Sequence, residues 1–375
     1  MAAEKTTSLE IKKMNRNRIY NLIKQEGSLS RQDLVYHLQL SLPTITQNLT
    51  ELKDEGLLCE SGSFGNTGGR RARAYSIVND AKVAIGLDIT KHHIAVVAVD
   101  LNGSTIKKAR IRYDFALDEE YFRKLGSLVE ELVSGAKIDT SRILGVGIAV
   151  PGLITEDHQR VFYGKILDFT GTTCDAFAQF IPYPCALFND ANAGGFAETW
   201  LEPDIKDAFY ISLSNNIGGS ILINNQVYTG EGPRSGEIGH ITILPDGPLC
   251  YCGQRGCFET CCSATILSDH TGGNLDEFFR LLKEGNPQFQ EQWKQYLHYL
   301  AIAVNNVRML FDCRVILGGY VGAYMDDYID ELRGLAAKRN TFENSAAYLQ
   351  VCKYKTEAIA AGAALPYIDS FLKSI

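Results

Sequence analysis

The first 80 residues place apolar side chains at the spacing of amphipathic helices, with short polar turns between them. We expect a helix over residues 11–25 and a second helix over residues 31–38 that begins after the hydroxyl cap of Ser30. A third helix is expected over residues 41–56. Its apolar stripe has the spacing of a buried face and consists of Ile45, Leu49 and Leu52.

The third helix also carries small hydroxyl and amide side chains, which suit phosphates and base edges in a DNA major groove. We expect these positions to be exposed and to contact DNA: Ser41, Thr44, Thr46, Gln47 and Asn48. Two short strands joined by a Gly-rich loop follow, and the loop carries Arg70 and Arg71, which can enter the minor groove. The pattern predicts a winged helix-turn-helix. A small helical domain that binds another protein is the alternative.

From Lys82 onward the pattern changes to strands rich in β-branched residues, alternating with helices. Strand–turn–strand units open at residues 83 and 208, and long helices are expected at residues 118–135 and 290–311. This repetition predicts a duplicated α/β fold with a cleft between two lobes. We therefore expect a DNA-binding domain over residues 1–80 and a second domain over residues 82–375.

The charge distribution differs between these two domains. The net charge is −7, yet residues 1–80 hold 11 Lys and Arg against 9 Asp and Glu. A mildly basic head on an acidic body is compatible with DNA binding confined to the head. No apolar run reaches the ~18 residues that a membrane helix needs, and the start does not resemble a signal peptide. We expect a cytoplasmic protein without a membrane partner.

Half of the ten cysteines lie within residues 250–262. His240, Cys250, Cys252 and Cys257 form a complete tetrahedral set for zinc in a loop over residues 240–257. Because such a set leaves no open position, we expect Zn²⁺ to be structural. A cluster of buried free thiols is the alternative.

These motifs resemble those of the ROK family of repressors, open reading frames and sugar kinases. The resemblance rests on G-E-x-G-H at residues 236–240, C-x-C-G-x-x-G-C at residues 250–257 and the Gly-Gly-Arg wing of the family's repressor branch. It implies a two-lobed actin/hexokinase-like (ribonuclease H-like) fold. The lobes would comprise residues 82–190 plus the C-terminal helix, and residues 191–355. Regulators of the xylose and N-acetylglucosamine types belong to this branch.

Sugar recognition needs carboxylates and amides that converge on neighbouring hydroxyls. Short motifs offer Asn189, Asp190, Glu237, His240 and Glu259, all of which match sugar-contacting positions of the family. The resemblance makes Asp190 a vestigial general base and lets His240 bind sugar with one ring nitrogen and zinc with the other. Ordinary structural polar groups are the alternative.

The phosphate-binding turns of the family's kinases are altered here. The first kinase turn, D-x-G-G-T, is replaced by residues 88–92 (DITKH), and the second, G-T-G-x-G-G, by residues 214–219 (SNNIGG). Side chains in these turns hinder the close approach of backbone N–H groups to phosphate. The nucleoside-side turn at residues 317–319 is kept.

We therefore expect a sugar-responsive repressor without enzymatic activity. It would bind operator DNA and a monosaccharide or sugar phosphate as a homodimer or tetramer. An ATP-dependent hexose kinase with an added head is the alternative function. A regulator that answers to a partner protein instead of a sugar is a third.

Overall fold

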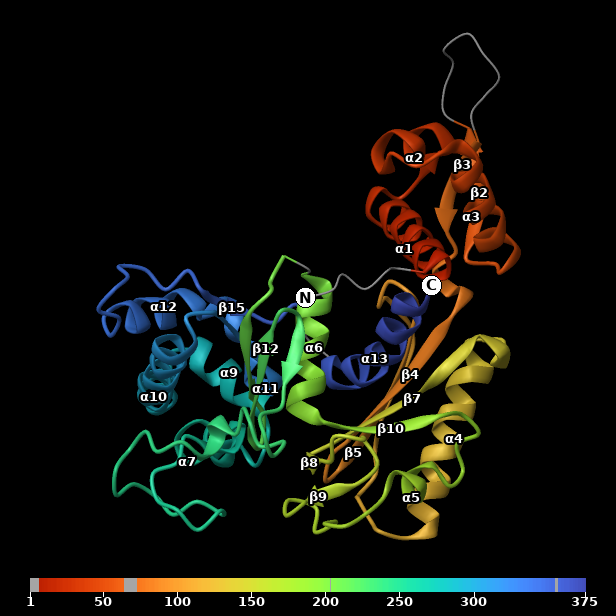
Figure 1. The fold of residues 1–375 in the computed structure, drawn as a ribbon. Coiled ribbons are helices and arrows are strands. Elements are labelled where there is room, and N and C mark those ends of the chain that lie inside the picture. The colour runs from red at the N-terminus through yellow and green to blue at the C-terminus, as the bar shows by residue number, and fades with distance from the viewer. Residues whose placement is uncertain (1–6, 64–72, 203, 355–356) are drawn as a thin grey trace.

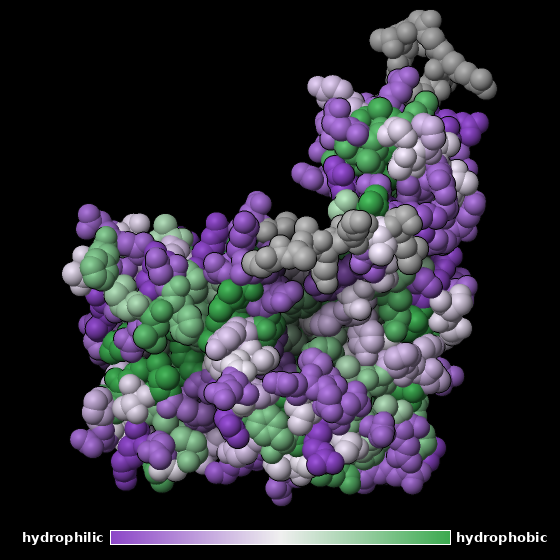
Figure 2. Space-filling model, viewed as in Figure 1, coloured by the Kyte–Doolittle hydropathy of each residue, from purple (hydrophilic) through white to green (hydrophobic). Residues whose placement is uncertain are grey.

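The computed structural model describes residues 7–63, 73–202, 204–354 and 357–375. The chain forms a small head and a larger body, and the head projects from one corner of the body (Figures 1 and 2). Arg70 and Arg71 lie outside the described residues. No helix of the described residues is long and apolar enough to cross a membrane.

The head consists of helices packed on a three-stranded antiparallel sheet of order β1-β3-β2. Its elements are α1 (Ser8–Glu26), β1 (Leu29–Ser30), α2 (Arg31–Leu38), α3 (Leu42–Asp54), β2 (Leu58–Ser63) and β3 (Arg73–Ile77). Ser30 and Ser41 cap α2 and α3 by accepting hydrogen bonds from backbone N–H groups three residues on. The described helices and strands are consistent with the expected helix-turn-helix head, and the loop expected to form the wing lies outside the described residues.

The first sheet of the body has the strand order β10-β7-β4-β5-β6. Its strands are β4 (Val83–Ile89), β5 (His93–Val99), β6 (Thr105–Arg112), β7 (Ile143–Val150) and β10 (Cys185–Asn189). One face packs on α4 (Glu119–Gly135) and on α5 (Cys174–Ala178). The other face packs on α13 (Ala358–Ser374), whose small residues let it lie close to the strands. A short hairpin, β8 (Leu153–Ile154) with β9 (Val161–Tyr163), follows β7.

The second sheet has the strand order β13-β12-β11-β14-β15. Its strands are β11 (Ala208–Leu213), β12 (Ile217–Ile223), β13 (Gln226–Tyr228), β14 (Arg314–Gly318) and β15 (Leu349–Val351). The helices beside it share its core cluster and include α7 (Glu259–Cys262), α8 (Ala264–Ser268), α9 (Leu275–Lys283), α10 (Pro287–Phe311), α11 (Gly319–Gly322) and α12 (Ile329–Ala337). Each sheet therefore has its own apolar core.

Helices α6 (Asp190–Leu201) and α13 pack against each other between the two sheets (Figure 1). Their contact is close because a Cβ atom added at Gly362 would lie 1.8 Å from the carbonyl oxygen of Ala193. Asn189 ends the strand and caps α6 directly, so that no loop is needed.

Candidate functional site

Four residues around the η3 turn (Ile238–His240) and the following loop bring their ligand atoms together. The atoms of His240, Cys250, Cys252 and Cys257 all lie within 4.8 Å of one another. All the cysteines described here are free thiols, and the Sγ atoms of Cys252 and Cys257 are 3.7 Å apart. The distance between Cys250 Sγ and His240 Nδ1 is also 3.7 Å. The sequence placed the same residues in one set.

The two separations of 3.7 Å match edges of a metal tetrahedron. Zn–S bonds of ~2.3 Å and Zn–N bonds of ~2.0–2.1 Å give edges of about 3.5–3.8 Å in a tetrahedral site. The loop reaches this geometry through Gly256, which adopts φ +71° and whose added Cβ would lie 1.7 Å from the carbonyl oxygen of Leu244. The donor set and its spacing can therefore hold a divalent metal ion.

Tyr251 lies between two of the cysteines and covers the second ring nitrogen of His240. Its hydroxyl is 3.2 Å from His240 Nε2, and Lys165 Nζ donates to its carbonyl oxygen at 2.9 Å. This contact was not predicted from the sequence. A ligand that uses His240 Nε2 must therefore replace the Tyr251 hydroxyl or bind beside it.

Asn189 and Asp190 lie where β10 meets α6. Asn189 Oδ1 accepts from the backbone N–H of Asn192 at 2.9 Å, and its Nδ2 donates to Gly152 O at 3.1 Å. Asp190 Oδ1 accepts from the N–H of Ala191 at 2.8 Å and from Asn189 Nδ2 at 3.2 Å. Asn189 thus fixes the Pro151-Gly152 turn against α6.

Two buried carboxyl groups, those of Asp88 and Asp190, interact electrostatically. Burial raises the pKa of Asp190 to about 6. Burial also raises the pKa of Asp88 to about 7, and the charge of Asp190 adds to this effect, while Arg110 opposes it. The cleft therefore favours protonated or hydrogen-bonded carboxyl groups rather than added negative charge.

Glu259 contacts the turn that replaces the second phosphate loop. It is 6% exposed, and its oxygens accept from the N–H of Ile217 at 2.6 Å and from Asn216 Nδ2 at 3.2 Å. The sequence predicted Glu259 as a sugar ligand and did not anticipate its bond to Asn216. Glu237 is exposed as a residue, but burial of its carboxyl group and the charge of Asp190 raise the pKa of that group to about 7. Electrostatic interactions link Glu237 to Asp190 and link Tyr251, which contacts His240, to both Glu237 and Glu259.

The described candidates for DNA contact lie on α3, but one of them is not available. Ser41 caps the helix and its Oγ is 2.8 Å from Thr44 Oγ1, while Gln47 is exposed and Thr46 is half-buried. Asn48 was expected to be exposed, and this was wrong. It is 3% exposed, and its Nδ2 donates to Thr44 O at 2.8 Å. Together with Ile45, Leu49 and Leu52 it completes the i, i+3, i+4, i+7 pattern of a buried face.

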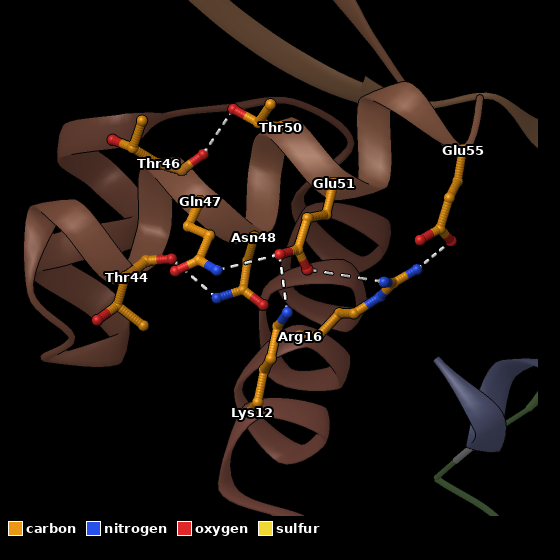
Figure 3. Close-up of polar contacts among 9 residues, drawn as sticks. All are labelled: Lys12, Arg16, Thr44, Thr46, Gln47, Asn48, Thr50, Glu51 and Glu55. Carbon is orange, nitrogen blue, oxygen red and sulfur yellow. Dashed lines mark hydrogen bonds and ion pairs between the residues drawn. The ribbon is translucent and has the colours of Figure 1, made fainter. Parts of the chain in front are cut away.

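The second half of α3 is acidic and is held by α1 (Figure 3). Lys12 Nζ lies 2.8 Å from Glu51 Oε1, and Arg16 pairs with Glu55. Gln47 Nε2 also donates to Glu51 Oε1, at 3.1 Å. These pairs were not foreseen from the sequence. They leave the first two turns of α3 as the part with neutral polar side chains.

The three turns that would surround a nucleotide lie at the ends of β4, β11 and β14. Thr90 closes the first turn, because its backbone N–H and its hydroxyl both bond to His93 O, at 3.0 and 3.2 Å. The second turn spans residues 214–216, so that Gly218 and Gly219 belong to β12. In the third, Gly319 has φ +75°, and an added Cβ would lie 2.6 Å from Ser214 Oγ.

A family model described as ROK family matches residues 84–369, well over half of the chain. The chain belongs to the ROK family. This ROK protein is 26% identical to the xylose repressor of Caldicellulosiruptor bescii, and the match covers 96% of this chain and 97% of the repressor. It is 24% identical to the DNA-binding transcriptional dual regulator NagC of Escherichia coli, over 73% of this chain and 67% of NagC.

Solved structures share the fold. A ROK family transcriptional regulator that is a homolog of the E. coli MLC protein superposes with a TM-score of 0.75 at 22% identity, over 97% of both chains. The ROK hexokinase of Thermus thermophilus superposes with a TM-score of 0.62 at 27% identity, over 76% of this ROK protein and 97% of the hexokinase. The predicted hexokinase-like body with an added head is confirmed.

Proposed function

We propose that this ROK protein is a sugar-responsive DNA-binding repressor of carbohydrate-utilisation genes. One observation carries the proposal: the same helix, α13, contacts both the DNA-binding head and the helix that positions the candidate sugar residues. Asn17 of α1 bonds to Leu372 of α13, and α13 packs on α6, whose first turn holds Asn189 and Asp190. The names of the relatives, a xylose repressor and NagC, support the same function.

The candidate sugar residues favour a hydroxyl-rich ligand. Asp190 and Glu237 can accept hydrogen bonds from neighbouring hydroxyls, and Asn189 adds an amide. Burial raises the pKa values of Asp88, Asp190 and Glu237, which shows that this region disfavours negative charge, and a phosphate group would add more of it. We therefore favour an unphosphorylated sugar over a sugar phosphate.

DNA contact is assigned to the head. Ser41, Thr44 and Gln47 occupy the first two turns of α3, and Thr46 lies beside them. Arg70 and Arg71 are assigned to the wing on sequence grounds. One recognition helix per chain reads one half-site, so we infer a homodimer, alone or as half of a tetramer, that spans two half-sites.

Zinc is assigned a structural role at His240, Cys250, Cys252 and Cys257. The separations of 3.7 Å between ligand atoms support tetrahedral coordination, which would use all four protein donors. The metal would hold residues 237–259 in one loop, and both Glu237 and Glu259 lie in that loop. Zinc would therefore stabilise the sugar site without taking part in a reaction.

Phosphoryl transfer is not assigned to this protein, although Asp190 is present. Transfer depends on positioning the nucleotide phosphates on close backbone N–H groups. In the first turn, the hydroxyl of Thr90 donates a hydrogen bond to His93 O. In the second turn, Glu259 accepts hydrogen bonds from Asn216 and from the N–H of Ile217. In addition, Arg110 of β6 contacts Tyr320 beside the third turn, with its guanidinium 5.7 Å from the ring centroid. These contacts support a regulator rather than a kinase.

The test is fluorescence anisotropy of the protein on labelled DNA from upstream of its own gene, with and without D-xylose, D-glucose and N-acetylglucosamine. The repressor function predicts tight binding that one sugar weakens. Failure to bind any fragment at low salt, combined with sugar-dependent ADP release from ATP, would establish the kinase instead.

A further inference from the structure

A cavity of about 380 Å³ adjoins the candidate sugar site. Its walls come from α6, α13 and the segments around β8 and β13. Asn189 and Glu237 lie on its wall, whereas Asp190, His240 and Glu259 are not among its described lining residues. The cavity thus begins at one side of the sugar residues and extends from there to α13.

The walls combine apolar surface with neutral polar groups. Phe188, Phe196, Pro233 and Pro366 supply apolar surface, and the ring of His158 lies 4.8 Å from that of Phe188. Amides and hydroxyls line the same space, namely Thr155, Asn192, Asn225, Gln226, Thr229 and Ser235. Small-molecule sites typically have this composition, and a sugar ring or a glycoside matches it with both C–H faces and hydroxyls.

The charges on the walls favour an uncharged occupant. Glu156 and Asp369 contribute carboxylates, and Lys373 is already paired with Asp369 at 2.7 Å. Glu237 adds a carboxyl group whose pKa is raised by burial to about 7. His158 uses its Nδ1 on Leu187 O at 2.8 Å. A ligand with a phosphate or carboxylate would therefore meet net repulsion.

Asn192 provides a specific point of attachment. It lines the cavity, and its Oδ1 is buried without a hydrogen-bond partner among the described residues. An unsatisfied buried acceptor destabilises the protein, and a ligand hydroxyl that donates to it would remove this cost.

We propose that this cavity is a second carbohydrate subsite, which holds the second ring or the aglycone of an uncharged glycoside whose first ring lies at Asn189 and Glu237. The inference rests on the proposed sugar response and names the class of effector: a disaccharide or glycoside rather than a free monosaccharide.

The position of the subsite relates the ligand to the head. Pro366, Asp369 and Lys373 face the cavity from α13. On the neighbouring stripe of the same helix, Leu365, Ile368 and Leu372 share one buried cluster with Ile19, Tyr20 and Ile23 of α1. An occupant of the cavity therefore contacts the helix on which the head is packed, and it can favour one arrangement of the head over another.

The experiment measures displacement of the operator complex by anisotropy. Each of D-xylose, D-glucose and N-acetylglucosamine is compared with its β-1,4-linked disaccharide and with its α- and β-phenyl glycosides. We expect one glycoside or disaccharide to act at a concentration at least about tenfold below that of its monosaccharide. Asn192→Ala, which removes the acceptor, and Thr229→Trp, which fills the exposed rim, should remove this gain.

Asn305→Ala is the matched control. Asn305 lies on α10, and its Oδ1 is also buried without a described partner, but it does not line the cavity. The gain should persist in this variant. If the monosaccharide is as effective as every glycoside, or if Asn192→Ala and Thr229→Trp both keep the gain, the subsite is refuted while the sugar response stands. If no sugar or glycoside changes DNA binding and none binds by calorimetry, the sugar response itself is refuted.

Discussion

Asn17 of the head donates a hydrogen bond from Nδ2 to the carbonyl oxygen of Leu372 in α13, 2.8 Å away. Leu372 lies in the last turn of that helix, where carbonyl groups have no partner within the helix. The head thus satisfies the C-terminal end of α13, and Lys24 adds a bond to Leu101 O at 3.1 Å. A change in the position of α13 must therefore alter the contacts that orient the head.

Truncation of Leu372 should weaken this coupling. Leu372 is 9% exposed and packs in the cluster shared by α1 and α13, so we expect Leu372→Ala to cost about 2 kcal/mol of unfolding free energy. DNA affinity without sugar should change little, but the sugar-induced change in affinity should fall at least about fivefold. Anisotropy titrations with and without the active sugar measure both quantities.

Leu282→Ala is the control for the loss of stability. Leu282 is 7% exposed and belongs to the core beside the second sheet. This core is a different cluster from the one that α13 shares with the head. Its truncation should cost a similar free energy and leave the sugar response intact. An unchanged sugar response in Leu372→Ala would contradict a route through α13.

Replacing Cys252 should release the metal. Serine is a poor zinc ligand, so Cys252→Ser leaves an incomplete set around His240 and the loop that carries Glu237 and Glu259 loses its anchor. We expect metal analysis by mass spectrometry to fall from about one zinc per chain to a small fraction, and the sugar response to disappear. Cys261→Ser, next to the set but outside it, should keep both. Full zinc content in Cys252→Ser would rule out the assigned site.

The helices of the head followed from the sequence because their signals are local. Ser30 and Ser41 cap α2 and α3 at the expected residues, and the stripe of Ile45, Leu49 and Leu52 is buried. The same periodicity could have identified Asn48 as buried, since it lies three residues after Ile45. The position of Asn48 in this stripe, rather than its amide chemistry, determines its burial.

Contacts between distant segments were not predictable in the same way. The zinc set was recognisable because its members lie within 18 residues of each other. By contrast, the bond from Glu259 to Asn216 and the packing of α13 on the head join segments that only the tertiary fold brings together. No periodicity or spacing within one segment contains that information.

Gln47 should carry base recognition on α3. It is exposed, and Glu51 holds its Nε2, so its Oε1 is the atom free to accept from a base edge. We expect Gln47→Ala to weaken operator binding by about tenfold or more, because a side-chain contact to a base edge is worth ~1–3 kcal/mol. Gln25→Ala, an exposed glutamine on α1, should leave the affinity unchanged. Equal affinities of Gln47→Ala and wild type in the anisotropy assay would remove Gln47 from the interface.

Asp88 should make stability depend on pH in a defined direction. Its pKa rises from 3.8 to about 7 through burial and the charge of Asp190, while Arg110 opposes the shift and the charge of Glu357 adds to it. A carboxyl group with a raised pKa in the folded state favours folding below pH 3.8, and this contribution is lost as the pH rises to about 7. Asp88→Asn, which stays neutral, should therefore unfold at a higher temperature than wild type at pH 8, and the difference should vanish near pH 4.

Asp139→Asn is the control of opposite sign, because the N–H of Ser141 lowers the pKa of Asp139, and its loss should not stabilise the protein at pH 8. Thermal melts across this pH range would contradict the assignment if Asp88→Asn were less stable than wild type at pH 8.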